Sequence, residues 1–288
     1  MTHPTTRVSP FKGVRYNAEV IDDLNQVVCP PYDVISPEDR VHYHNIDQCN
    51  FVRLVLGEEF ETDSDTNNRF TRARAYLDKW LADGSLKQDD TPAMYVYRQD
   101  FVRDGNTLTV TGLICAVKLH EYEDSVILPH ENTLARPKSQ LAELIRNVKA
   151  NLDSVYGLYE DPQRDVQQII ENTMSQTPAI DVIDKDGVNH RIWIISDAPL
   201  LEKIVAFFED KQIAIADGHH RYETTLAYSK EAREALPEDK KSQPLDSDYA
   251  LMTLANVYQD DLTVLPTHRV MFSLSAESFS PYASYSTK

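Results

Sequence analysis

The spacing of apolar residues predicts several helices along the chain. Over residues 71–84 apolar side chains recur every three or four positions, which places them on one helix face. The same spacing predicts a helix over residues 141–155 and another over residues 162–175. Ser36 followed by Pro37 is typical of a helix start, because serine caps the first turn and proline fits its first position.

Alternating apolar residues around two Asp-Gly steps predict two β-hairpins. The first hairpin turns at Asp104-Gly105 and the second at Asp186-Gly187. Asp-Gly is a strong hairpin signal, because both residues tolerate the positive φ angles of a two-residue turn. The sequence therefore predicts antiparallel strands on both sides of each step.

Other apolar runs complete the expected set of elements. The run 51–59 suits a strand, which we expect to end near Gly57. Residues 198–236 predict a helix, a short strand, a tight turn and a second helix, and residues 249–257 predict a further strand.

Together the elements predict a mixed α/β (α+β) fold. We expect an N-terminal α+β region with hairpins over residues 1–190 and a strand-turn-helix region over residues 191–288, and the two could form one domain. The final residues lose their periodicity and become rich in serine and tyrosine, so we expect a truncated C-terminal end.

Composition narrows the classes of function. The 288 residues include 46 acidic and 29 basic side chains, a net charge of -17 that disfavours nucleic acid as the main partner. No apolar run approaches a membrane span and the first residues lack a signal-peptide pattern, so we expect a soluble cytoplasmic protein without a membrane partner. The three cysteines form no Cys-x-x-Cys pair, and we expect them to be reduced and mostly structural.

The densest polar cluster is the turn Asp217-Gly218-His219-His220-Arg221, between a short strand and a helix. Such a turn leaves backbone N–H groups unpaired at the positive end of a helix dipole, which favours an anion. Arg221 adds a fork suited to phosphate, the histidines add donors, and Asp217 could act as a base or bind magnesium. Zinc is disfavoured, because adjacent helical residues point about 100° apart. The alternative is a solvated helix cap.

Further polar residues could complete a catalytic site. His130 and Glu131 precede the predicted helix at 141–155 and could provide a base or a metal ligand, or they could simply enter that helix. The remaining candidates are Tyr32 and Asp33 after a stiff Pro-Pro step, Glu223 one turn into a helix, and His268 and Arg269 at the end of a strand. Each of them could instead have a purely structural role.

Seven separated motifs resemble the family called domain of unknown function 1015, and they occur in the family's order. They are PFKGVRYN, PPYDVISPED, NFVRLVLGEE, LPHENTL, GLYED, IADGHHRYETTL and LPTHR. The helix-strand-turn-helix segment also resembles the ParB and sulfiredoxin fold, which includes a free-serine kinase with the same Asp-Gly-His-His-Arg string. That resemblance implies that residues 218–221 bind phosphate, with Asp217 beside them.

The leading hypothesis is therefore a protein that binds a nucleotide or another phosphorylated small molecule. ATP or ADP with magnesium is the expected cofactor. The more specific form of this hypothesis is an enzyme that transfers a phosphoryl group to a small hydroxylated acceptor. The first alternative is a non-catalytic regulator that responds to such a ligand. The second is ParB-type nucleic-acid binding or cleavage, which the net charge disfavours. The sequence does not determine the oligomeric state.

Overall fold

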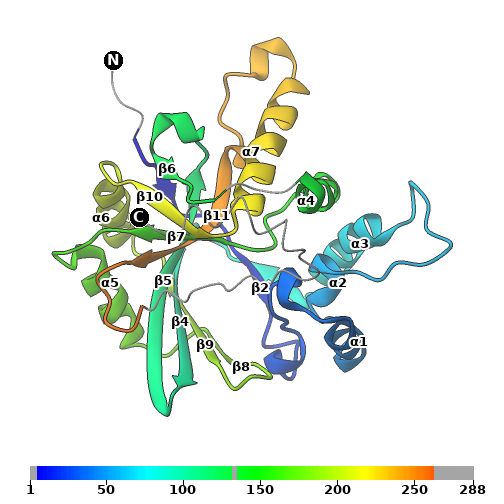
Figure 1. The fold of residues 1–288 in the computed structure, drawn as a ribbon, viewed down its shortest axis with the longest axis horizontal. Helices are drawn as coiled ribbons and strands as arrows, with labels where there is room; N and C mark the ends of the chain where they lie inside the picture. Colours follow the sequence, from blue (N-terminus) through cyan, green and yellow to red (C-terminus); the bar gives the residue numbers. More distant parts are fainter. Residues whose placement is uncertain (1–4, 132–134, 263–288) are drawn as a thin grey trace, which may run out of the picture.

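The computed structural model describes residues 5–131 and 135–262, and its centre is one mixed sheet (Figure 1). In this part of the chain the sheet has nine strands, eight of which lie in the order β6-β10-β7-β11-β5-β4-β9-β8, while β1 pairs with β5. The strands are β1 (Val8–Ser9), β4 (Met94–Arg103), β5 (Asn106–Lys118), β6 (Ile127–Leu128), β7 (Val155–Tyr159), β8 (Ile180–Ile183), β9 (Asn189–Ile195), β10 (Ile213–Asp217) and β11 (Tyr249–Asn256).

Both predicted hairpins are confirmed. The pairs β4–β5 and β8–β9 are antiparallel, and each turns at its Asp-Gly step. Gly105 and Gly187 both have φ of +78°, and Asp104 has φ of +51°. In the first hairpin Asp104 and Gly105 form a two-residue turn between Arg103 and Asn106. The second loop is longer, because Asp184 is hydrogen-bonded to Val188 and only Gly187 between them has a positive φ.

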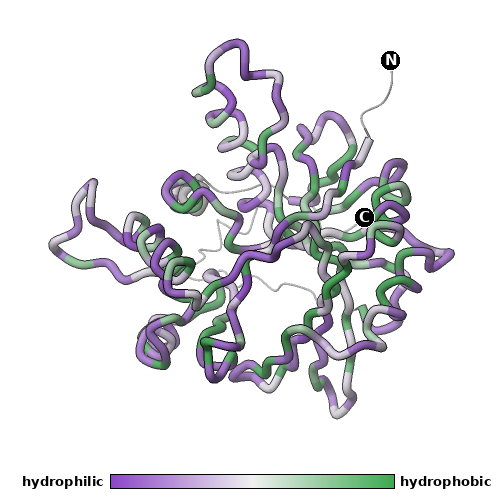
Figure 2. Tube along the Cα trace, turned by 180° about the vertical axis from the view of Figure 1, so that it is seen from behind, coloured by the Kyte–Doolittle hydropathy of each residue, from purple (hydrophilic) through white to green (hydrophobic). Residues whose placement is uncertain are grey.

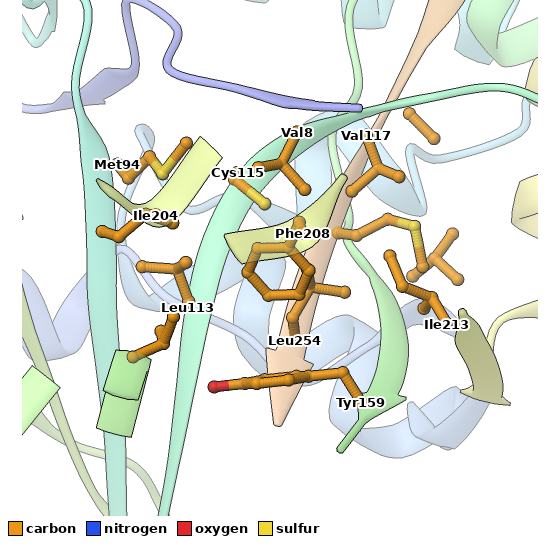
Figure 3. Packing of buried hydrophobic residues seen from close by; sticks show 14 of the residues in the cluster. Val8, Met94, Leu113, Cys115, Val117, Tyr159, Ile204, Phe208, Ile213 and Leu254 are labelled. Carbon is orange, nitrogen blue, oxygen red and sulfur yellow. The ribbon is translucent and has the colours of Figure 1, made fainter. Parts of the chain in front are cut away.

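Two helices cover one face of the sheet. They are α5 (Asp165–Met174) and α6 (Ala198–Phe208), as predicted from their apolar spacing. Ile204 and Phe208 of α6 are fully buried and pack with Leu113 and Leu254 from the sheet (Figure 3). The large contiguous apolar area that this face removes from water is the main source of stability here.

A second, smaller core lies within a unit of three helices and a separate two-stranded antiparallel sheet. Its elements are β2 (Val14–Tyr16), α1 (Pro37–Ile46), α2 (Val52–Val55), α3 (Arg69–Ala82) and β3 (Leu86–Gln88). Leu54 and Trp80 are buried in it, and Val148 reaches it from the end of α4 (Ala135–Val148). The predicted cap is present, because the Ser36 side chain accepts a hydrogen bond from the backbone N–H of Asp39.

The helix α4 connects this unit to the helix that follows β10. That helix is α7 (His219–Glu234), and Arg146 of α4 donates two hydrogen bonds to the carboxylate of Glu231, at 2.9 and 2.7 Å. Figure 2 shows mostly hydrophilic positions along α7, in contrast to the more hydrophobic sheet strands. The polar α7 therefore combines side-chain pairs with α4 and one fully buried aromatic residue, Tyr222, in the main core.

One predicted element is wrong, and one predicted helix is too long. Residues 51–59 do not form a strand, because α2 begins here and Asn50 accepts a hydrogen bond from the N–H of Val52 at 3.0 Å. Side-chain hydrogen bonding to the backbone and burial of Leu54 together outweigh β-propensity. The predicted helix 141–155 ends early, since Lys149 has φ of +55°. The missed strand β7 begins at Val155 and pairs with β10 and β11.

Strands from both sides of residue 190 hydrogen-bond in the one sheet, and residue 190 itself lies in β9. In particular, β10 and β11 flank β7. Among the described residues, no helix is both long and apolar enough to cross a bilayer.

Candidate functional site

Strand β10, Gly218 and helix α7 form the predicted strand-turn-helix unit. Ile213 and Ile215 anchor β10 in the core, and the helix begins at His219. Gly218 has φ of +91°, and a Cβ atom there would lie 3.1 Å from Nη1 of Arg221 and 3.3 Å from Cα of Val155. Both the backbone conformation and the available space therefore require glycine at this turn.

The sheet order brings other segments to this turn. Strand β6 pairs in parallel with β10, with Ile127 opposite Ile213, so the residues after β6 arrive beside the residues after β10. Strand β7 runs antiparallel to β10, with Tyr156 opposite Asp217, so the residues before β7 reach the same edge. Segments that are far apart in the sequence thus meet at the start of α7.

The first of these segments places His130 and Glu131 against His219. His219 is 1% exposed, and its Nε2 accepts a hydrogen bond from the backbone N–H of His130 at 3.2 Å. The two rings meet edge-on, with centroids 4.5 Å apart. Since Nε2 is the acceptor, a neutral His219 carries its proton on Nδ1. That atom lies 3.2 Å from Oε1 of Glu131, yet its alignment does not make a hydrogen bond.

The protonation of these two histidines follows from their surroundings. Burial and the neighbouring His130 lower the pKa of His219 below its usual 6.5, while Glu131 opposes this effect. Nδ1 of His130 lies 2.7 Å from the carbonyl oxygen of Ile215, to which it donates when the ring is neutral. In that tautomer the lone pair of the exposed His130 lies on Nε2.

The second segment surrounds Arg221. Its Nε lies 3.3 Å from Oδ2 of Asp153, its Nη2 donates to Oδ2 of Asp217 at 3.0 Å, and its Nη1 donates to the carbonyl oxygen of Ser154. The Arg221 side chain is 12% exposed, whereas the side chain of Asp217 is 67% exposed. The expected phosphate fork is thus paired with carboxylates in this structure.

Asp153 is a site residue that the sequence reasoning missed. Asp153 was missed because it lies within the helix predicted over 141–155. The signal that could have identified it is a polar Asp-Ser step directly before an alternating strand. Burial raises the pKa of its carboxyl group, as do the charges of Asp33 and Asp217, and Arg221 opposes them. The structure therefore surrounds one guanidinium with several carboxylates.

The remaining candidate residues lie at different distances from the turn. Tyr32 lines a pocket together with Arg221, and burial raises the pKa of its phenol. Asp33 is exposed, and its charge acts on Asp153 and Tyr32. His220 and Glu223 are half-buried on α7. The predicted candidates His268 and Arg269 lie outside the described residues.

Comparison with known families now identifies the group of proteins. Residues 8–284 match the family described as "Protein of unknown function (DUF1015)". The chain belongs to this family. Neither the curated proteins nor the solved structures include a match to the chain. The resemblance of the turn to the ParB and sulfiredoxin fold therefore stays a prediction.

Within the described residues of this family member, no group of three or more His, Cys, Asp and Glu side chains could hold a metal ion. Magnesium commonly uses only one or two protein carboxylates when substrate phosphates supply the other ligands. The exposed Asp217 could therefore contribute to a magnesium site that a bound phosphate completes.

Proposed function

We propose that the start of α7 binds the phosphates of a nucleotide, and that the protein transfers a phosphoryl group to a small hydroxylated acceptor. The observation that supports this most is the contact of His130 and Glu131 with His219 at the start of α7, which has no side-chain cap. This contact places possible acid-base groups from a distant part of the chain beside the start of α7, where backbone N–H groups favour an anion.

Each residue has a role in this proposal. The N–H groups at the start of α7 hold phosphate oxygens, and the exposed Asp217 would bind magnesium together with those phosphates. The acceptor oxygen attacks the terminal phosphorus atom, and the P–O bond to the leaving diphosphate breaks. The acceptor proton moves to Nε2 of His130, so atoms and charge balance with MgADP as the second product.

A second function has a specific observation in its favour. Arg221 is already paired with Asp153 and Asp217, so an anion that displaces either carboxylate changes the contacts of Arg221. A regulator that binds a nucleotide without turnover would use such a rearrangement as its signal. Product formation separates the two functions.

Calorimetric titration with ATP, ADP and CTP, each with and without magnesium, tests the binding step. We expect magnesium-dependent binding that weakens when Gly218→Ala crowds the turn. Absence of binding by the folded protein would contradict both functions.

Mass spectrometry of hydroxylated acceptors incubated with MgATP tests the transfer step. We expect phosphorylated product from the natural chain and at least a hundredfold less from His130→Gln, the range that general bases contribute. His42→Gln is the matched control, because His42 is an exposed histidine on α1. Binding without product would favour the regulator.

A further inference from the structure

A pocket lies between α4, α7 and the short 3-10 turn at Tyr32, and we call it the Tyr32 pocket. Arg221 contributes to its wall, so the pocket adjoins the proposed phosphate site. Its two walls differ in chemistry. That difference indicates an amphipathic small molecule.

One wall of the Tyr32 pocket is aliphatic. Val55 comes from α2, Leu141 and Ile145 come from α4, and all three side chains are half-buried. Branched side chains of this kind offer no hydrogen bonds and favour a hydrocarbon body of similar width. The second core and α4 thus supply the apolar half of the pocket.

The other wall has a hydroxyl group without a partner. Thr224 of α7 is 5% exposed, and its Oγ1 makes no hydrogen bond among the described residues. The next residue, Thr225, has the same side chain, but its Oγ1 donates to the carbonyl oxygen of Arg221 at 2.9 Å. A buried hydroxyl without a partner is unfavourable, so a ligand group that contacts it gains binding energy.

The charge near the polar wall is negative on balance. Arg221 is the cation among the lining residues described, and it faces the carboxylates of Asp153 and Asp217. Asp33 adds a third negative charge close enough to act on Asp153. A ligand with a positive group gains from this surplus, whereas a carboxylate ligand meets repulsion.

We infer that the Tyr32 pocket binds a small aliphatic amine. Its ammonium group donates to Asp153 and to the Oγ1 of Thr224, and its hydrocarbon body lies along Leu141, Ile145 and Val55. As the acceptor of the proposed phosphoryl transfer, the ligand would also carry a hydroxyl group, and that part rests on the proposed function.

Three probes of equal size test this inference in the absence of nucleotide. They are 3-methylbutylamine, 3-methylbutan-1-ol and 3-methylbutanoate, titrated into the full chain and followed by NMR. We expect the amine to bind about tenfold more tightly than the alcohol, a difference of about 1.4 kcal/mol, because a hydrogen bond to a charged group is stronger than one between neutral groups. The carboxylate should bind most weakly.

Two variants locate the contact. Asp153→Asn should reduce the preference for the amine over the alcohol, and Thr224→Val should weaken binding of both, because valine has the same shape without the hydroxyl. Asp78→Asn on α3 is the control, since Asp78 is an exposed aspartate outside the pocket. Circular dichroism checks that each variant is folded.

The affinities of the natural chain for the amine and the alcohol decide whether the Tyr32 pocket binds an amine. Equal affinity for amine and alcohol, or no binding of the amine, would overturn it. The nucleotide titration is a separate measurement, so loss of amine binding with intact MgATP binding rejects only the Tyr32 pocket, and the reverse result rejects only the phosphate site.

Discussion

The ring of His130 meets the ring of His219 edge-on at a centroid distance of 4.5 Å, although 89 positions separate the two residues. The contact exists because β6 and β10 pair in parallel and deliver both residues to one edge of the sheet. The contact brings the His130 imidazole and the Glu131 carboxylate to the start of α7.

Replacing Gly218 with alanine should destabilise the protein by about 1–3 kcal/mol, because the positive φ is strained for alanine and the new Cβ meets Arg221 and Val155. Gly105→Ala is the matched control: it shares a positive φ but has no atom within 4 Å of the new Cβ. Urea denaturation of both variants measures the difference. Equal losses would show that crowding at Gly218 contributes nothing.

The buried His219 should make stability fall in mildly acidic solution. The pKa of His219 in the folded protein lies below the ordinary 6.5. Just below pH 6.5 the histidine is therefore protonated in the unfolded chain while it is still neutral in the folded protein. The stability is therefore complete above about pH 6.5 and declines as the pH falls toward the folded pKa.

The test compares the natural chain with His219→Gln. Free energies of unfolding at about pH 7.5 and 5.5 should fall more steeply in the natural chain than in the variant, which has no titrating group at this position. Parallel pH profiles would mean that His219 does not resist protonation.

Replacing Tyr222 with phenylalanine should cost about 1–3 kcal/mol. The Tyr222 hydroxyl donates to the carbonyl oxygen of His120 at 2.8 Å and accepts from its N–H at 2.9 Å, so it ties α7 to the end of β5. Tyr258→Phe is the control, because Tyr258 is 50% exposed. Thermal and urea unfolding give the comparison. An unchanged stability of Tyr222→Phe would show that this contact does not stabilise α7.

Replacing Asp161 with alanine should destabilise the start of α5 by about 2–4 kcal/mol. Its carboxylate is buried and accepts hydrogen bonds from the N–H groups of Asp165, Val166 and Gln167, at 2.8, 2.9 and 3.1 Å. Asp161→Asn keeps one acceptor oxygen and should lose about half as much. Hydrogen exchange of the three amides measures the effect, and unchanged protection in Asp161→Ala would refute it.

The sequence by itself determined the features that depend on near neighbours. Both hairpins follow from Asp-Gly steps, α1 begins at the Ser36 cap, and the strand-turn-helix at Gly218 is as expected. Each depends on φ preferences, capping or apolar periodicity within a few residues, which the chain carries locally. The same reasoning failed at residues 51–59, where burial of Leu54 in the second core outweighs the preference for a strand.

The tertiary structure alone decided which distant groups meet. The sequence marked His130 and Arg221 separately, but the order of strands places His130 against His219, and the start of β7 places Asp153 against Arg221. Nothing near Asp153 in the chain predicts its ion pair, because the energy of that contact depends on a sheet assembled from segments dozens of residues apart.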